Sequence, residues 1–182
     1  MRAEQVFYDD VAAGDVIPPL TVTVDEVQMF FFSAATYNGH RIHYDKDWAR
    51  AVEGYDNVLV QGPLQAALLA RAITDWIGGQ GRLVAYSVQN RAIAFPGDVL
   101  TFGGVVTGKR LARRRDERCS EEQNASDECS REEQNASDER CSEEQNAGEQ
   151  GLVDLDIAGR RGITVLMPGT ATVALPRRRE AP

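Results

Sequence analysis

The sequence predicts an α+β fold in which an antiparallel sheet wraps around one long helix. An apolar segment with helical spacing follows Gln61-Gly62-Pro63 and ends at Gly78-Gly79. The segments after it are rich in Val, Ile, Thr and aromatic residues and are separated by Gly and Pro. One buried helix followed by four or five such strands is typical of an α+β domain, and 182 residues suffice for one domain.

Two shorter helices are expected before the long one. Thr23 and Glu26 form a capping box, which predicts a helix that ends near the turn signal Asn38-Gly39. Asp45 predicts the start of a second, short helix, which Gly54 closes. The first of these helices would carry an apolar face made of Val27, Phe30, Phe31, Ala34 and Ala35.

The long helix is expected to begin at Pro63, whose fixed φ suits the first helical turn. Its apolar residues recur at helical spacing, which predicts that it is the most buried helix. These residues are Leu64, Leu68, Ala72, Ile73, Trp76 and Ile77. The predicted strands are 82–89, 90–95, 98–109, 151–159 and 162–175.

Three copies of an eleven-residue unit interrupt the strand region at 116–148: DERCSEEQNAS, DECSREEQNAS and DERCSEEQNAG. A segment so polar cannot bury enough apolar area to offset the entropy of ordering it. We therefore predict one domain over 1–182, with 113–150 as an inserted low-complexity surface segment, disordered or helical, between two consecutive strands. All three cysteines lie in the repeats, but no histidine accompanies them there, so a redox or metal sensor has little support.

Composition and charge argue against several classes of protein. The net charge is −8, and residues 113–149 alone hold 13 Asp/Glu against six Lys/Arg, so the rest is nearly neutral. No basic patch with interleaved aromatic residues favours nucleic acid as a partner. No apolar stretch approaches the roughly 20 residues of a membrane span, and the N-terminus lacks the apolar core of a secretion signal. A cytoplasmic protein without a membrane partner is expected.

Both histidines, His40 and His43, lie in the nine-residue segment YNGHRIHYD between two predicted helices. Imidazole titrates near about 6.5 and exchanges protons at cellular pH, so the pair is a candidate acid/base centre. Three other interpretations stay open: one histidine caps a helix or binds a buried carbonyl, the pair lies on the surface, or His-x-x-His binds a metal. The last lacks a third ligand, so no metal site is predicted.

Gly62 at the start of the long helix is the second candidate. Helix N-termini present unpaired N–H groups and a positive dipole end, which suit a developing enolate oxygen. The alternative is an ordinary helix start, with Pro63 selected for its φ.

Residues 33–72, SAATYNGHRIHYDKDWARAVEGYDNVLVQGPLQAALLARA, resemble the MaoC-like hydratase/dehydratase family of hotdog proteins. The most specific strings are NGHRIHYD and VQGPL, and FPGDVL and PGTATVALP extend the resemblance over nearly the whole chain outside the repeats. The resemblance implies a single hotdog fold. It is strongest to the branch of mesaconyl-CoA-type hydratases and mitochondrial 3-hydroxyacyl-thioester dehydratases.

The resemblance also implies roles for residues. His43 matches the family's catalytic histidine, and the Gly62 N–H is expected to bind the thioester carbonyl. The family's Asp, Asn and Pro are replaced by Asn38, His40 and Arg41, so Asn38 or His40 is expected to orient the water or supply a second proton. The predicted substrate contacts are Tyr37, Gln61, Pro63 and Arg91. Lys109 and Arg110, with Arg91, either bind coenzyme A phosphates or are ordinary surface charges.

The implied activity is hydration or dehydration of an enoyl or 3-hydroxyacyl thioester of coenzyme A or an acyl carrier. It needs no metal and no redox cofactor. A homodimer or a hetero-oligomer with another hotdog chain is expected. Two alternatives stay open: a thioesterase that uses Glu53 or Asp56, and a non-catalytic half-site subunit.

Overall fold

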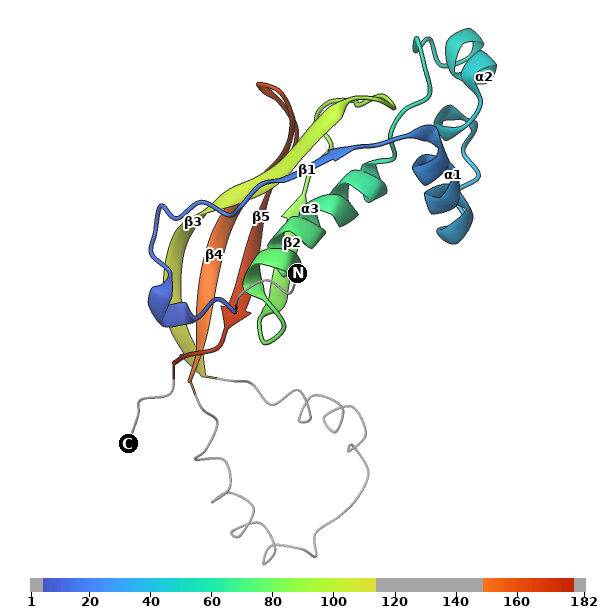
Figure 1. The fold of residues 1–182 in the computed structure, drawn as a ribbon. Coiled ribbons are helices and arrows are strands. Elements are labelled where there is room, and N and C mark those ends of the chain that lie inside the picture. The colour runs from blue at the N-terminus through green and yellow to red at the C-terminus, as the bar shows by residue number, and fades with distance from the viewer. Residues whose placement is uncertain (1–4, 114–148, 179–182) are drawn as a thin grey trace, which may run out of the picture.

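The computed structural model describes residues 5–113 and 149–178. In these residues, five strands form one antiparallel sheet in the order β1-β3-β4-β5-β2. The sheet curls around helix α3 (Gly62–Ile77), which lies along its concave face (Figure 1). The predicted α+β architecture is therefore confirmed. The strands are β1 (Leu20–Thr23), β2 (Arg82–Val88), β3 (Val99–Arg113), β4 (Glu149–Arg161) and β5 (Thr164–Leu175).

Helix α3 forms where its apolar spacing predicts. Pro63 stands in its first turn, and Gly78 ends it with a φ of +73°, a conformation that glycine adopts without a steric penalty. Trp76 is only partly buried against the core. The buried face consists of Leu64, Gln65, Leu68, Leu69, Ala72, Ile73 and Ile77.

The core lies between α3 and the sheet. Phe102 of β3, Leu155 of β4 and Val173 of β5 are fully buried against the helix layer. Side chains of this size each contribute roughly 1.5–3 kcal/mol when removed from water. Tyr86 of β2 ties the sheet to the helix, because its hydroxyl donates to the Ala66 carbonyl oxygen at 2.8 Å. Burial raises the pKa of Tyr86 to about 12, so the hydroxyl keeps the proton that it donates.

Two details of the strand prediction are wrong. Residues 90–95 are not a strand: the N–H groups of Arg91 and Ala92 both donate to the Leu166 carbonyl oxygen, whereas a ladder would use alternate residues. The fifth strand is instead β1 from the N-terminal lead-in, which pairs with β3. The lead-in also forms a 3-10 turn, η1 (Tyr8–Asp10).

The repeats lie outside the described residues. The strands on either side of them, β3 and β4, pair antiparallel from Thr101↔Arg160 to Arg113↔Glu149. The prediction that the flanking segments are consecutive strands of one sheet is therefore confirmed.

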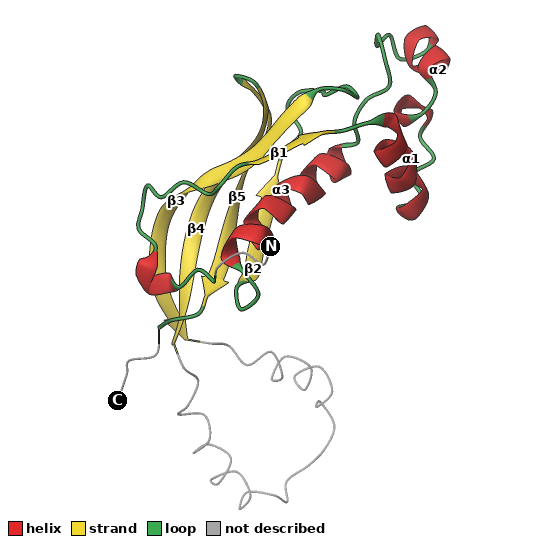
Figure 2. Cartoon of the chain, viewed as in Figure 1, coloured by secondary structure: helices red, strands yellow, loops and turns green. Residues whose placement is uncertain are grey.

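Three short helical elements form a lobe beyond the N-terminal end of α3 (Figure 2): α1 (Glu26–Ala35), η2 (Arg41–His43) and α2 (Lys46–Ala51). Asp45 caps α2 as predicted. The predicted cap of α1 is wrong, because Thr23 ends β1 and the side chain of Asp25 accepts the Gln28 N–H at 2.7 Å.

The predicted apolar face of α1 exists, but it does not face the core of this chain. Its large side chains are exposed, with 62% of Val27, 60% of Phe30 and 65% of Phe31 accessible to solvent. Met29 and Ser33, on the other side of the helix, are the buried residues. The lobe therefore presents an apolar surface that no described residue of this chain covers.

Candidate active site

His43 lies in η2 and is half-buried. Its Nδ1 is 2.8 Å from the Leu59 carbonyl oxygen, and the Leu59 N–H donates to the Ile42 carbonyl oxygen at 3.0 Å. A carbonyl only accepts, so the neutral ring carries its proton on Nδ1 and leaves the Nε2 lone pair free. Nε2 is therefore the ring nitrogen that can accept a proton.

The surroundings of His43 also favour the neutral ring. Burial lowers the pKa of His43 below its ordinary value of 6.5, and the nearby His40 lowers it further. The hydrogen bond to Leu59 opposes this shift but is the smaller effect. A base with a lowered pKa stays unprotonated at neutral pH.

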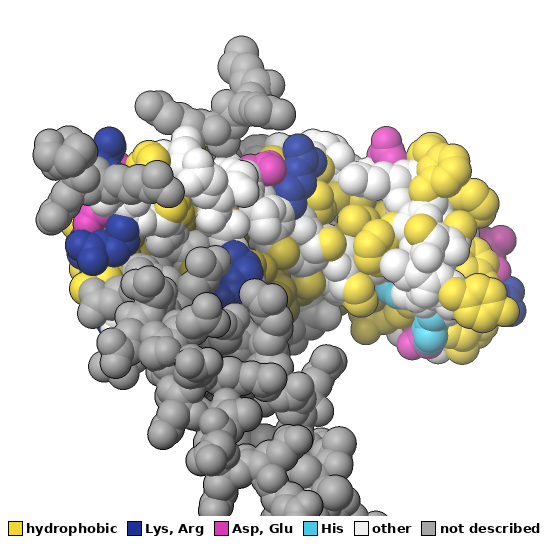
Figure 3. Space-filling view, turned by 90° about the horizontal axis from the view of Figure 1, so that it is seen from below, with side chains coloured by type: hydrophobic (Ala, Val, Ile, Leu, Met, Phe, Trp, Pro, Cys, Tyr) yellow, Lys and Arg dark blue, Asp and Glu magenta, His cyan; other side chains and the backbone are white. Residues whose placement is uncertain are grey.

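His40 is exposed, and its ring accepts a hydrogen bond that stabilises the start of η2. Its Nδ1 accepts the Ile42 N–H at 3.3 Å and so caps η2, which is one of the alternatives left open by the sequence. Its ring lies 6.0 Å from the His43 ring and 5.4 Å from the Trp48 ring, measured between centroids. The two imidazoles are therefore neighbours. Figure 3 shows the histidines among the hydrophobic side chains of the lobe.

Asn38 occupies the position of the family's aspartate. Its Oδ1 accepts the His40 N–H at 3.2 Å, and its own N–H donates to the Ser33 carbonyl oxygen at 2.9 Å. Tyr37 beside it is 99% exposed and has a positive φ of 53°. The loop therefore presents the Asn38 amide near the histidines and the Tyr37 ring to solvent.

Gly62 begins α3 and is covered by a residue that the sequence did not indicate. A Cβ at Gly62 would overlap the carboxamide of Asn90, so this exposed side chain would have to move to admit any larger residue there. The backbone on either side of Asn90 is held by β5: Gln89 donates to Pro168 and Arg91 to Leu166. The available signal was that an Asn follows the β2 strand pattern directly, but this is also typical of any strand end.

The other predicted substrate contacts differ in their exposure to solvent and in their hydrogen-bond partners. Gln61 is fully buried, and its amide donates to α1. Pro63 is exposed at the start of α3, next to Gly62. Arg91 is exposed, and its guanidinium donates to the Gln89 side chain.

The other charged candidates have partners or lie outside the histidine loop. Lys109 donates to the Tyr8 carbonyl oxygen at 3.2 Å, and Arg110 pairs with Asp154. These bonds are those of ordinary surface charges on β3. Glu53 and Asp56 are exposed in the turn after α2.

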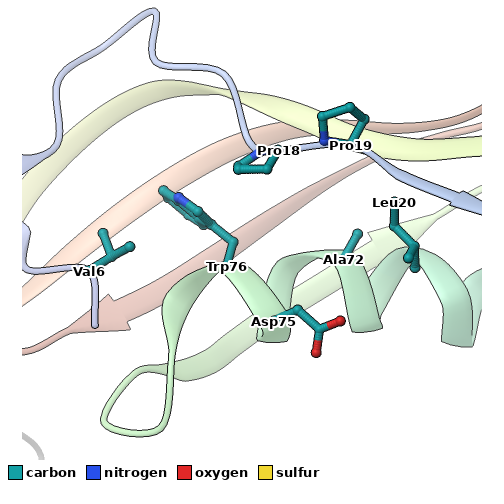
Figure 4. A pocket seen from close by; sticks show the side chains of 7 residues that line it. All are labelled: Val6, Pro18, Pro19, Leu20, Ala72, Asp75 and Trp76. Atoms are coloured by element: carbon teal, nitrogen blue, oxygen red, sulfur yellow. The ribbon is translucent and has the colours of Figure 1, made fainter. Parts of the chain in front are cut away.

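A separate pocket of about 480 Å³ lies near the other end of α3 (Figure 4). Its walls come from the lead-in and the C-terminal half of α3. Ala72, the nearest of these helix residues to Gly62, is ten residues along, which corresponds to about 15 Å at 1.5 Å per residue. The pocket is therefore distinct from the histidine loop. It is lined by Val6, Pro18, Pro19, Leu20, Ala72, Asp75 and Trp76.

Two further observations concern the described part of the chain alone. It contains no cluster of three or more His, Cys, Asp or Glu side chains placed to hold a metal ion. None of its helices combines the length and the apolar character needed to cross a membrane.

The arrangement can perform acid/base chemistry. Leu59 bonds to the His43 ring and Gly62 begins α3 three residues later, so a short stretch of chain links the base to the helix N-terminus. The free Nε2 of His43 can accept a proton, while the Gly62 N–H can stabilise an oxyanion.

The chain is similar to proteins named as hydratases and dehydratases. The model of the family "hydroxyacyl-thioester dehydratase type 2" matches residues 10–95. Mesaconyl-C(4)-CoA hydratase of Chloroflexus aurantiacus is 53% identical over 107 residues, which are 59% of this chain and 35% of the relative. Mitochondrial hydroxyacyl-thioester dehydratase type 2 of Saccharomyces cerevisiae is 33% identical over 79 residues, 43% of this chain and 28% of the relative. The chain thus spans about a third of the length of these relatives.

The fold is similar to that of solved structures. R-hydratase PhaJ1 of Pseudomonas aeruginosa superposes with a TM-score of 0.70 at 15% identity, over 100% of this chain and 97% of that one. This likeness confirms the predicted hotdog fold.

Proposed function

We propose that the chain is a member of the MaoC-like hydratase/dehydratase family of hotdog proteins and a lyase acting on acyl thioesters. It adds water to an enoyl thioester or removes water from a 3-hydroxyacyl thioester. The names of both curated relatives support this substrate class. The thiol is coenzyme A or an acyl carrier.

The proposed hydration uses the groups at the helix N-terminus. The thioester carbonyl accepts a hydrogen bond from the Gly62 N–H, and Nε2 of His43 removes a proton from water as the oxygen bonds to Cβ. The electron pair of the double bond moves onto the thioester as an enolate, which then takes a proton at Cα. Asn38 or His40 orients the water or supplies this second proton. Dehydration is the reverse: the α-proton returns to the group that delivered it, and protonated His43 gives its proton to the departing hydroxyl.

One observation carries the proposal: Nδ1 of His43 lies 2.8 Å from the carbonyl oxygen of Leu59, which fixes the ring next to the chain entering α3. Because the hydrogen bond at Nδ1 fixes the orientation of the ring, Nε2 points in one direction. The lowered pKa of His43 keeps that nitrogen unprotonated. These are the requirements of a general base at neutral pH.

The test is His43→Ala with a short enoyl-CoA, followed by the loss of enoyl absorbance. The loss of the base should lower kcat by about 10²–10⁴-fold while circular dichroism shows an unchanged fold. Arg71→Ala serves as a control at an exposed residue of α3 that is not among the predicted site residues. Retained activity in the His43 variant would remove this residue from the mechanism, and release of free thiol without a change in enoyl absorbance would indicate a thioesterase.

A second candidate is a half-site subunit that needs another hotdog chain. It is favoured by Asn38, which stands where the family resemblance places an aspartate. The isolated chain would then be inactive on every thioester. Adding a second MaoC-like chain would restore turnover.

A further inference from the structure

The side chain of Gln61 connects two elements that are far apart in sequence. It is fully buried, and its Nε2 donates to the Met29 carbonyl oxygen at 2.8 Å and to Ser33 Oγ at 2.9 Å, both on α1. Gln61 directly precedes Gly62, so these bonds attach α1 to the N-terminal end of α3. Hydrogen bonds of this kind each contribute about 1 kcal/mol net.

Stability alone does not account for this arrangement. The Gln61 Oε1 is buried and has no hydrogen-bond partner among the described residues. A buried acceptor without a partner costs about 1–3 kcal/mol, which offsets much of what the two donated bonds contribute. An apolar side chain of the same size would avoid that cost, so the carboxamide is better explained by the geometry that it imposes.

The bonds continue from Ser33 to the histidine loop. The Ser33 carbonyl oxygen accepts the Asn38 N–H at 2.9 Å, and Asn38 Oδ1 accepts the His40 N–H at 3.2 Å. The far end of the loop is bonded to Leu59 through Ile42 and His43. The loop is therefore held at both ends by residues 59 and 61, immediately before Gly62.

We propose that Gln61 is a positioning residue that fixes the Asn38–His43 loop relative to Gly62 and does not itself contact the substrate. This inference rests on the proposed function. It replaces the substrate contact that the resemblance predicted for Gln61. The Gln61 amide donates its hydrogen bond to α1 and is buried away from solvent, so it cannot contact a ligand.

The experiment compares Gln61→Met with Gln65→Met. Gln65 lies one turn further along α3, is also buried at 2% exposure and also has an unpartnered Oε1, but its Nε2 makes only a 3.5 Å contact with the Val60 carbonyl oxygen of the preceding segment. Misplaced catalytic groups should lower kcat about 10- to 100-fold in Gln61→Met, with KM within about twofold. Gln65→Met should retain the kcat of the wild type. Ser33→Ala, which removes one acceptor and keeps Gln61, should show a smaller loss in kcat.

A second measurement does not depend on turnover. The pKa of His43, followed by NMR titration, should rise towards 6.5 in Gln61→Met, because a loosened loop exposes the ring to water. It should stay unchanged in Gln65→Met. Wild-type protein that turns over no thioester would refute the proposed function, and the NMR comparison would still decide the role of Gln61. Equal kcat and equal His43 pKa in the two Met variants would overturn the inference, and so would a Ser33→Ala variant with wild-type kcat if Gln61→Met fails to fold.

Discussion

At the scale of single residues, the imidazole of His43 has two different nitrogens. Nδ1 is bound to Leu59, and Nε2 has no hydrogen-bond partner among the residues that the structure describes. The Leu59 bond would be strengthened by a proton on the ring, but burial outweighs it and lowers the pKa of His43. The neutral form, which is the base, therefore predominates at a lower pH than for a free histidine.

This environment predicts a pH profile. Activity requires unprotonated His43, so kcat/KM should fall as the pH decreases through the pKa of that residue. Because this pKa is lowered, the midpoint of the acidic limb should lie below pH 6.5. The measurement is kcat/KM for an enoyl-CoA across the range from about pH 5 to 8. A midpoint above pH 6.5 would mean that burial does not control this ring, and Arg71→Ala, at an exposed residue outside the predicted site, should show the wild-type midpoint.

Some residue roles could be predicted from the sequence and others could not. His43 and Gly62 can be predicted because imidazoles and helix starts have local signatures, and the family resemblance favoured these two residues over the other interpretations. The contact between Asn90 and Gly62 could not be found, because the two residues are 28 positions apart and only the path of the chain after β2 brings them together. The hydrogen bonds of the Gln61 side chain could not be predicted for the same reason, because they depend on where α1 packs.

At the scale of elements, periodicity predicted α3 well because its apolar face meets the sheet of the same chain. For α1 the same signal identified residues that share a face but not what that face contacts. Residues 90–95 have side chains that are typical of a strand. Their backbone nevertheless bonds to β5 in an irregular pattern, so no strand forms. Hydrophobic patterns thus report shared faces, whereas packing decides what covers them.

The cap of α1 offers a test of the corrected boundary. Asp25→Ala removes the carboxylate that accepts the Gln28 N–H, so it should lower the free energy of unfolding by about 0.5–2 kcal/mol. Thr23→Ala, at the exposed end of β1, should cost less than Asp25→Ala because Thr23 does not cap the helix. Urea unfolding of both variants measures the difference. A larger loss of unfolding free energy for Thr23→Ala than for Asp25→Ala would show that Thr23 caps the helix after all.

At the scale of the whole molecule, the described residues leave one apolar surface uncovered. Helix α1, whose exposed apolar side chains form this surface, belongs to the lobe beyond the N-terminal end of α3 (Figure 1). Contiguous apolar surface of this kind marks an interaction site.

We therefore expect a second copy of the chain to cover the face of Val27, Phe30 and Phe31. Phe31→Lys would place a charge in that interface, where burying it unpaired is costly, so the assembly should dissociate. Light scattering during gel filtration should give twice the 20.0 kDa of one chain for the wild type and 20.0 kDa for the variant. Ile163→Lys is the matched control, because Ile163 is 98% exposed in the turn between β4 and β5, away from the lobe. A wild-type protein of single mass, or a Phe31→Lys variant that keeps the double mass, would show that a second copy does not cover this face.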